Sequence, residues 1–556
     1  MDKRTLLALA LIAIVLVGSQ LFFKQPRRPA PVVDTTAAAT ATSPVTTTAN
    51  GAAPVAPTPT PSLATPAPAD TGRLAKQPPT MTTLTTPKAD FILTNPGAAP
   101  TSVQVSSFRD LSPKTPKGTP VRLRAGKAPL LRFRLALGKD TIALDTVQFT
   151  VTQLGGATTF ASPFLRLTYQ AAADGFRTEV RGEVPNAPPG TALLIDLPPT
   201  LESVEADSID DARHLAYGFR RPRRDVESIS FSKLDSLATR VDTGGMQWVA
   251  ARNKYWLVAL MKPVGDSGAA FNGLVTRGGP AIGKVKRLAH ATTVFPVVNG
   301  RIAFDLYAGP QSWQVLRAFG NELENVNPYA GFLHAVVQPF ATIVMRTLLW
   351  MKATFQVNYG WVLVLFGVLI RLLLWPLNQK AMRTSIQMQR LQPELQEIQK
   401  KYKTDPEKQR DALVKLYASH GMSPLSPMLG CLPMLLPMPI LFALYFVFQN
   451  TIEFRDVQFL WLPDISLKDP FFIIPIVMGG SMFLLSWIGM RGMPPNPQAK
   501  MMSYMMPVMF TVMFLNFASG LNLYYAVQNI AALPQQWVLT RERAKAAAAT
   551  PAARKT

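Results

Sequence analysis

The sequence predicts a polytopic α-helical membrane protein of six spans with a large extracytoplasmic all-β, sandwich-like domain and a cytoplasmic helical hairpin. Three observations predict this class: an uncharged apolar run near the N-terminus, a central stretch of period-two alternation, and five further apolar runs beyond it. Among the 556 residues, 57 Lys+Arg exceed 34 Asp+Glu, for a net charge of +23. Such an excess suits nucleic acid, an anionic membrane or acidic partners, so the position of the charges must decide.

No metal or cofactor site is expected. The single Cys431 excludes an intramolecular disulfide framework, and four scattered histidines make a clustered zinc site a poor hypothesis. A phosphate-binding GxxxxGK[ST] loop is also missing from the sequence.

The N-terminus predicts a membrane anchor over residues 1–25. The uncharged run from Leu6 to Phe23 is 18 residues long, which exceeds the apolar core of a cleaved signal peptide. From 26 to 80 the chain is almost entirely Ala, Pro and Thr, so it buries too little apolar surface to fold and is predicted to be a disordered tether.

Residues 81–328 predict the soluble β domain. Apolar residues alternate with polar ones, as in Leu131, Phe133 and Leu135 against Arg132 and Arg134, and this is the period of half-buried strands. No helical crossover spacing intervenes, so an antiparallel sandwich is expected.

Two short motifs in this domain are interpreted as structural features without a catalytic or nucleic-acid-binding role. The tetrapeptide at 265–268, Gly-Asp-Ser-Gly, resembles a serine protease nucleophile loop, but His214 lies too near in sequence to complete that scaffold, and a tight turn is favoured. The Arg-rich stretch at 220–224 lacks interleaved aromatic residues, so a solvated loop is favoured and no specific nucleic-acid target is expected.

Residues 329–356 predict an amphipathic helix at the membrane surface, with a packed core helix as the alternative. Phe340, Val344, Leu348 and Met351 recur at helical spacing. Residues 357–540 then predict a five-span core. Its apolar runs are Tyr359–Trp375, Cys431–Phe448, Phe471–Met490, Met501–Phe517 and Leu521–Leu539.

Loop charge predicts the orientation of these spans. The segment Asn378–Ser423 carries nine Lys/Arg, and Arg491–Lys500 carries two with no acid, whereas Gln449–Asp469 carries four acids against two cations. Basic loops stay in the cytoplasm, so both termini, including the basic tail 541–556, are expected there. The β domain is then expected outside, in the periplasm of a two-membrane bacterium.

Arg371 is the one Asp, Glu, Lys, Arg or His side chain within the five later predicted spans. Either it snorkels to the headgroups, or it lines a water-filled recess and presents positive charge. In the last span, polar residues including Asn522, Gln528, Asn529 and Gln535 fall on one helical arc. That arc faces a recess or serves helix–helix hydrogen bonds.

Several functions are disfavoured by the spans. They contain no Asp or Glu to carry a coupling ion, which disfavours an ion-coupled transporter. They also contain no base to activate Ser481 beside Gly479 and Gly480, which disfavours an intramembrane serine protease.

The cytoplasmic segment 379–421 predicts a helical hairpin, because apolar residues recur at helical spacing on both sides of Thr404–Glu407. Its apolar stripe either closes on itself or docks a partner helix.

Ordered motifs from about Tyr329 to Leu539 resemble the YidC/Oxa/Alb family of membrane protein insertases. They are RLLLWP at 371–376, LQPELQEIQKKY at 391–402, PLSPMLGCLP at 424–433, MPILFALY at 438–445 and SGLNLYY at 519–525. The anchor, large β domain and five further spans resemble the Gram-negative form, whose periplasmic domain is a β-supersandwich. The tether is longer, and the tail shorter, than that form suggests.

The resemblance implies an insertase and chaperone for nascent inner-membrane proteins, working alone or with the Sec translocon and hydrolysing nothing. It implies that Arg371 lies in a hydrophilic groove, which we expect to include Gln528, Asn529 and Gln535. We expect the client helix to slide along the third and fifth spans. Candidate contacts are Phe442, Tyr445, Phe446, Met509, Phe514 and Tyr525. Expected partners are nascent membrane proteins, the Sec translocon, the ribosome and signal-recognition components at the cytoplasmic loops, and anionic lipids.

Two other classes stay open at this point. A channel or transporter for a small anion would use Arg371 as its attractant, although the paired broken helices of transporters are not visible. A membrane-tethered scaffold would need only the β domain, although six spans exceed what anchoring requires. The methionines around Met501 to Met509 suit varied client helices or simply pack.

Overall fold

The fold is described from a computed structural model, over residues 79–263, 271–280, 285–327, 334–402, 405–419, 438–491 and 497–548. The predicted anchor, nearly all of the tether, the tetrapeptide at 265–268 and Cys431 lie outside these residues. Their predictions therefore stay untested.

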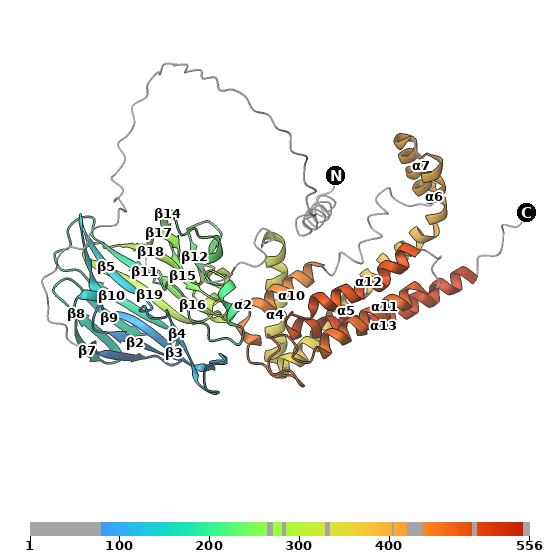
Figure 1. The fold of residues 1–556 in the computed structure, drawn as a ribbon. Coiled ribbons are helices and arrows are strands. Elements are labelled where there is room, and N and C mark those ends of the chain that lie inside the picture. Colours follow the sequence, from blue (N-terminus) through green and yellow to red (C-terminus); the bar gives the residue numbers. More distant parts are fainter. Residues whose placement is uncertain are drawn as a thin grey trace, which may run out of the picture. The chain divides into compact units, whose positions relative to one another are not determined.

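The β domain contains three antiparallel sheets (Figure 1). The first has the order β1 (Met81–Thr85), β2 (Ala89–Thr94), β3 (Ala99–Arg109) and β4 (Pro120–Arg124). The second has the order β13 (Val226–Ser230), β12 (Ala216–Arg220), β15 (Trp248–Arg252), β16 (Trp256–Met261), β19 (Arg301–Pro310), β10 (Arg177–Glu183), β9 (Arg166–Ala171), β8 (Ala157–Ala161) and β7 (Thr150–Leu154). The third has the order β14 (Thr239–Met246), β17 (Phe271–Gly278), β18 (Ala289–Pro296), β11 (Ala192–Asp196), β5 (Arg132–Leu137) and β6 (Asp140–Ala143).

The alternation seen in the sequence places one set of side chains in a shared core. In β5, Phe133 and Leu135 are buried while Arg132 is exposed. Phe304 of the second sheet packs against Phe295 of the third, with ring centroids 5.8 Å apart. Burial of each such ring stabilises the domain by about 1.5–3 kcal/mol. The predicted antiparallel sandwich is confirmed.

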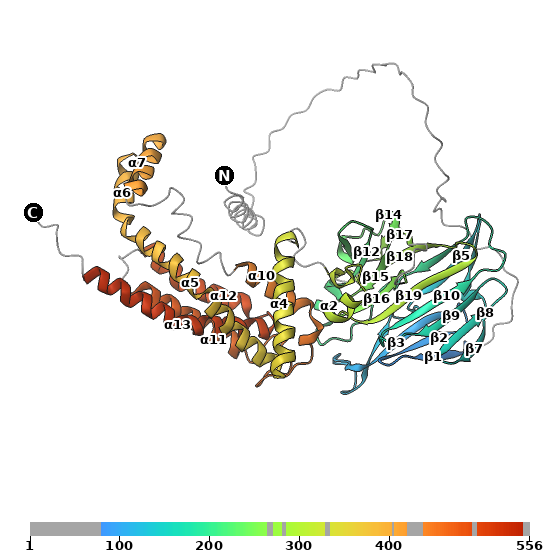
Figure 2. The same ribbon diagram turned by 180° about the vertical axis from the view of Figure 1, so that it is seen from behind.

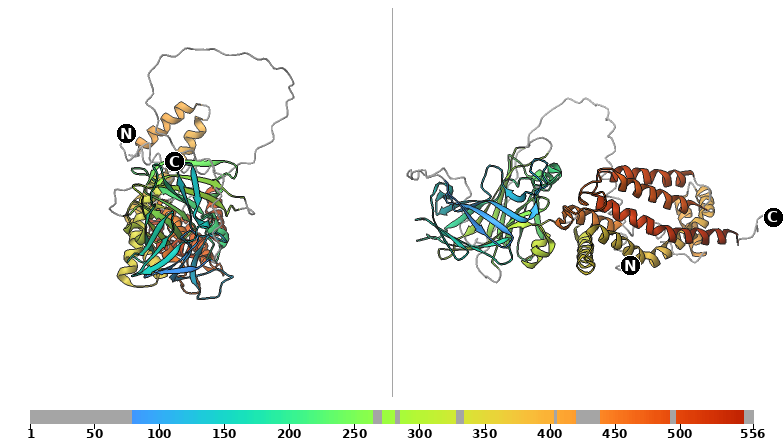
Figure 3. Two further views of the ribbon diagram at one scale, coloured as in Figure 1. Left: turned by 90° about the vertical axis from the view of Figure 1, so that its left-hand side faces the viewer. Right: turned by 90° about the horizontal axis from the view of Figure 1, so that it is seen from below.

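The helical region contains α4 (His334–Phe355), α5 (Tyr359–Arg390), α10 (Met438–Asn450), α11 (Ile473–Met490), α12 (Pro497–Phe514) and α13 (Ser519–Ala548). Helix α13 packs against both α5 and α11, α12 packs against α11, and α10 packs against α4 (Figure 2, Figure 3). Within the described residues, Tyr359–Gln379 and Ile473–Met490 are long and apolar enough to span a membrane. The apolar segments Ile440–Asn450 and Ser503–Phe514 are shorter, so the predicted count of six spans is not confirmed.

The first helix of the core is longer than predicted. α5 continues through Pro376 to Arg390, whereas the sequence predicts an apolar span that ends at Trp375 and a cytoplasmic loop from Asn378. Good helix formers such as Gln, Lys, Met and Arg occupy this extension and sustain the helix. The two hairpin helices are present as α6 (Gln392–Lys401) and α7 (Pro406–Ser419), and they pack against each other.

Helix α4 has two different apolar faces. Val344, Leu348 and Met351 are buried, as expected of the stripe that predicted this helix. Phe340 belonged to the same predicted stripe but is 41% exposed, and Ile343 is also exposed. The buried face of α4 packs as in a core helix. Its exposed apolar face is compatible with the predicted position at the membrane surface, which stays a prediction.

A buried ion pair joins the β domain to the segment that follows α10. Arg455 Nε donates to both carboxylate oxygens of Glu205, at 3.0 and 2.8 Å, and its side chain is only 1% exposed. Arg455 Nη2 also donates to the carbonyl oxygen of Val204. The Nε1 of Trp256 donates to the same Glu205 carboxylate at 2.9 Å. Buried charges need this degree of pairing, because isolated ones are strongly unfavourable.

A second buried acid lies near this pair on α2 (Ser208–Arg213). Burial, and then repulsion from Glu205, raise the pKa of Asp211 from 3.8 to about 7. Asn253 Nδ2 and the backbone N–H of Lys254 donate to its carboxylate. Between these two pKa values the folded state holds a proton that the unfolded state has lost, so this group lowers stability as the pH rises from about 4 to about 7.

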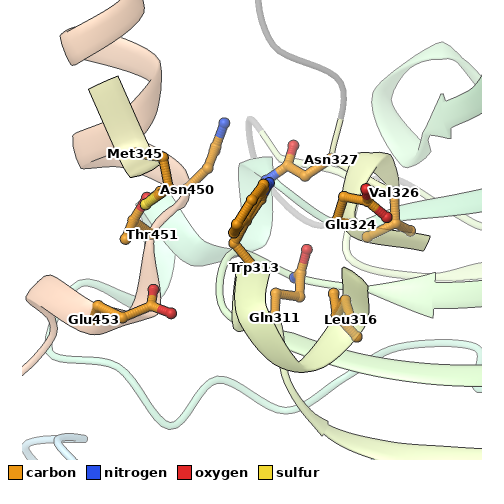
Figure 4. Close-up of a pocket in the computed structure, with 10 residues that line it drawn as sticks. All are labelled: Gln311, Trp313, Leu316, Glu324, Val326, Asn327, Met345, Asn450, Thr451 and Glu453. Carbon is orange, nitrogen blue, oxygen red and sulfur yellow. The ribbon is translucent and has the colours of Figure 1, made fainter. Parts of the chain in front are cut away.

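A small pocket lies beside the same segment (Figure 4). Trp313 of α3 (Trp313–Ala318) stands in its middle, with Glu453 on one side and Glu324 on the other. Ser312 Oγ donates to Glu453 Oε1 at 2.9 Å, and burial raises the pKa of Glu453. The two carboxylates lie on opposite sides of the indole, so they do not form a shared cation site.

Candidate functional site

Arg371 lies on α5 within the segment that is apolar enough to span a membrane. Its Nη2 donates a hydrogen bond of 2.7 Å to Gln535 Oε1 of α13. The buried Nε has no partner among the described residues, and no ion pair joins this guanidinium to a described carboxylate. The charge is therefore held by a neutral amide. A guanidinium offers five N–H donors, so it retains capacity to bind a further acceptor.

The polar side chains of α13 connect it to two neighbouring helices. Gln535 Nε2 donates to the carbonyl oxygen of Trp375 on α5 at 3.0 Å, and Gln528 Nε2 donates to that of Gly367 at 3.1 Å. Asn529 Nδ2 lies 3.4 Å from the carbonyl oxygen of Met478 on α11. These contacts support the helix–helix alternative for the polar arc.

Gln535 is the member of the arc that reaches Arg371. It is 2% exposed, so it positions the guanidinium from within the helix packing. The direct contacts described do not bring Gln528 or Asn529 to Arg371. Their place beside Arg371 in a groove stays a proposal.

The candidate client contacts divide by exposure. Met509 on α12 is 46% exposed, and Phe442, Tyr445, Phe446 and Tyr525 are half-buried. Phe514 is only 3% exposed and packs against Phe510, Phe517 and Tyr525. Phe514 therefore has almost no free surface in this arrangement, and its direct contact with a client stays a prediction.

Two partners in the polar network were not anticipated. Tyr524 Oη accepts a hydrogen bond of 2.9 Å from Gln528, and Ser481 Oγ accepts one of 3.3 Å from Asn529. The signal for Tyr524 was its spacing of four residues from Gln528, which places both on one helix face. Within the described part of the chain, no group of three or more His, Cys, Asp or Glu residues is placed to hold a metal ion.

Comparison with known proteins gives two family matches. The family described as 60Kd inner membrane protein matches residues 350–546, and the YidC periplasmic domain matches residues 165–343. The membrane protein insertase YidC of Citrifermentans bemidjiense is 31% identical over 402 residues, covering 71% of this chain and 70% of that protein. That of Geobacter metallireducens is 29% identical over 567 residues, covering 99% and 100%.

Other similarities are more partial. The insertase YidC of Anaeromyxobacter dehalogenans is 36% identical over 316 residues, and the chain spans about half (54%) of that relative's length. The crystal structure of YidC from Thermotoga maritima aligns with a TM-score of 0.31 at 16% identity, covering 83% of this chain and 99% of that one. So low a score adds nothing to the assignment, which rests on the sequence relatives.

The matched regions define an inner-membrane protein with a periplasmic β domain and a helical membrane region. The extent and identity of the alignment to the Citrifermentans protein make the assignment specific. The chain belongs to the YidC family of membrane protein insertases.

Proposed function

We propose that this protein inserts nascent inner-membrane proteins and assists their folding, with Arg371 as the positive centre of a hydrophilic groove. The proposed groove includes Gln528, Asn529 and Gln535. It attracts the polar or acidic segment of a client that must cross the membrane. No covalent bond is made or broken, so the activity is not enzymatic.

The observation that carries the proposal is the sparse hydrogen bonding of the Arg371 side chain, which extends from α5 to α13. A charge within hydrocarbon costs about 2.5–3.5 kcal/mol or more, and here one hydrogen bond to Gln535 holds it while Nε stays unpartnered. A visiting carboxylate or backbone carbonyl would accept from guanidinium N–H groups other than the buried Nε. Such an acceptor recovers part of the cost of the buried charge, and this favours entry of polar client segments.

The remaining energy comes from the client itself. Each Leu, Ile, Val or Phe near the centre of a client span favours the bilayer by about 0.3–0.6 kcal/mol. The insertase has only to lower the barrier for the polar flank. Phe442, Tyr445, Phe446, Met509 and Tyr525 are proposed to guide the client helix, because they retain surface beyond the helix packing.

The proposed setting is a multi-pass protein of the bacterial inner membrane with six spans. Both termini and the hairpin α6–α7 face the cytoplasm, and the β domain faces the periplasm. Loop charge supports this orientation. The proposed partners are nascent membrane proteins, the Sec translocon, anionic lipids, and the ribosome with signal-recognition components at the cytoplasmic loops.

Insertion into liposomes tests the proposal. The full chain is reconstituted into liposomes, and a single-span client protein with an acidic outer tail is synthesised in their presence. Protease protection of the tail then measures insertion. With the wild-type protein, we expect the client tail to become protected from protease. With Arg371→Ala we expect weak protection, and with Arg371→Lys most of the wild-type protection.

The matched control is Arg166→Ala, which removes the same charge from an exposed position on β9. We expect it to behave as wild type. Equal protection by Arg371→Ala and wild type would remove the groove charge from the mechanism. No protection above that of empty liposomes would contradict the insertase activity itself.

A further inference from the structure

Two arginines near the end of α11 and on α13 are each stacked on a tryptophan. The guanidinium carbon of Arg491 lies 3.7 Å from the ring centroid of Trp487, and that of Arg541 lies 3.3 Å from the ring centroid of Trp537. A pocket of about 260 Å³ lies between them, lined by Ile488, Arg491, Trp537, Thr540, Arg541 and Ala544. Stacking occupies the flat faces of the guanidinium groups and leaves their in-plane N–H donors free.

Hydrogen bonds between α11 and α13 hold the two sides of this pocket together. Arg543 Nη1 donates to the carbonyl oxygen of Gly489 at 2.7 Å, and Thr540 Oγ1 donates to that of Ile488 at 3.2 Å. The carbonyl groups at the C-terminus of α11 would otherwise repel an anion. These donors, above all the charged Arg543, offset that effect.

The length of α11 and the residues at its end favour a position of this pocket at a membrane surface. Helix α11 has 18 residues and is apolar enough to span, so it is about 27 Å long against about 30 Å of hydrocarbon. Trp487 and Trp537 are 40% and 48% exposed. Exposed tryptophans beside arginines at a helix end are typical of the headgroup region. This placement holds for either orientation of the protein.

We propose that this pocket binds the headgroup of an anionic phospholipid, with Arg491 and Arg541 donating to its phosphate oxygens. The residues lining the pocket supply two positive charges and no carboxylate, and no described ion pair involves either arginine. Ile488 and Ala544 give the glycerol and upper acyl carbons an apolar surface. Arginine binds phosphate oxygens in a bidentate manner, so each guanidinium offers two donors to a phosphate in the pocket.

The chemistry of the pocket selects against zwitterionic lipids. An ammonium or choline group needs a carboxylate or a free aromatic face. No carboxylate lines the pocket, and a guanidinium already covers one face of Trp537, the one aromatic residue that lines it. Phosphatidylglycerol and cardiolipin have no such cation, so they fit better than phosphatidylethanolamine.

Native mass spectrometry of the full chain in detergent tests this site. Retention of phosphatidylglycerol is compared with retention of phosphatidylethanolamine at equal concentrations. The variants are the double substitution Arg491→Gln/Arg541→Gln and its charge-keeping counterpart Arg491→Lys/Arg541→Lys. We expect selective retention of phosphatidylglycerol by wild type, about tenfold weaker retention by the Gln variant, and intermediate retention by the Lys variant.

The matched control is Arg410→Gln/Lys415→Gln on the exposed surface of α7, which removes the same total charge. The proposal requires this control to retain phosphatidylglycerol like wild type. Equal loss in the control, or equal retention of the two lipids by wild type, overturns it.

Competition separates the possible sources of phosphate. Millimolar inorganic phosphate that displaces the lipid completely would make this a site for free phosphate. A short ribosomal RNA hairpin that loses affinity for the Gln variant, while lipid retention is unchanged, would assign the arginines to nucleic acid. Either result contradicts the lipid site.

Discussion

Replacing Glu205 with Gln removes the carboxylate that faces Arg455 inside the protein, and we expect the β domain to lose stability. Removing one partner of a buried ion pair costs about 3–5 kcal/mol, because the other charge stays buried. Here Arg455 Nη2 keeps the carbonyl oxygens of Arg109 and Val204, and the Gln oxygen still accepts from one donor. The expected loss is therefore near the lower end, about 3 kcal/mol.

The double variant Glu205→Gln/Arg455→Met separates lost pairing from a stranded charge. Met has a flexible apolar side chain that fills irregular space, and no charge stays buried once both partners are neutral. We therefore expect the double variant to be more stable than Glu205→Gln alone. This non-additivity is the signature of direct coupling between the two residues.

Heating the full chain in detergent while following tryptophan fluorescence measures the effect. In a domain of this size, about 3 kcal/mol corresponds to a midpoint lower by about 6–12 °C. The matched control is Glu322→Gln, which breaks the ion pair with Arg220, where the Glu322 side chain is 46% exposed. An exposed pair is worth about 0–1 kcal/mol. If Glu205→Gln and Glu322→Gln shift the midpoint equally, the reasoning is wrong.

Two further predictions concern burial and close packing. Asp211→Asn cannot ionise, but it keeps an acceptor for only one of the two N–H donors. Relative to wild type, we expect the stability of this variant to rise by at most about 4 kcal/mol between pH 4 and pH 8. Melting curves at both pH values measure this change, and a difference between variant and wild type that does not depend on pH would refute it. Gly479→Ala places a methyl group within 1.8 Å of Thr511 Oγ1, whereas Gly480→Ala meets nothing within 4 Å. We expect Gly479→Ala to lower the stability by about 1–3 kcal/mol and Gly480→Ala to raise it by about 0.5–1 kcal/mol. Thermal melting midpoints in detergent measure both effects. Equal midpoints would contradict the packing of α11 on α12.

Local periodicity was a reliable guide where one face of an element is buried. The alternation around Phe133 correctly predicted strand β5 and its buried face. The same logic predicted α4, yet Phe340 lies on its exposed side. Helical spacing gives the direction of an apolar stripe, but the width of the contact depends on the neighbouring helix.

Hydrophobic length is only partly tested in the membrane region. Within the described residues, the apolar segments of α10 and α12 are shorter than a full span, and the start of the run that ends at Phe448 lies outside those residues, so these two predicted spans stay unconfirmed. The sequence also predicts a cytoplasmic loop from Asn378, because polar residues begin there, whereas α5 continues to Arg390. Polarity alone does not end a helix when its residues are good helix formers.

The sequence by itself determined the β-sandwich class, the helical region, the hairpin helices and the isolated charge at Arg371, because each depends on local pattern or composition. Only the tertiary structure decided which groups meet across long separations. Gln535 reaches Arg371 from another helix, Glu205 reaches Arg455 across the β domain boundary, and the Arg491 and Arg541 side chains flank one pocket. Such contacts depend on how the elements pack, and the spacing of residues along one element does not identify which other residues pack against it.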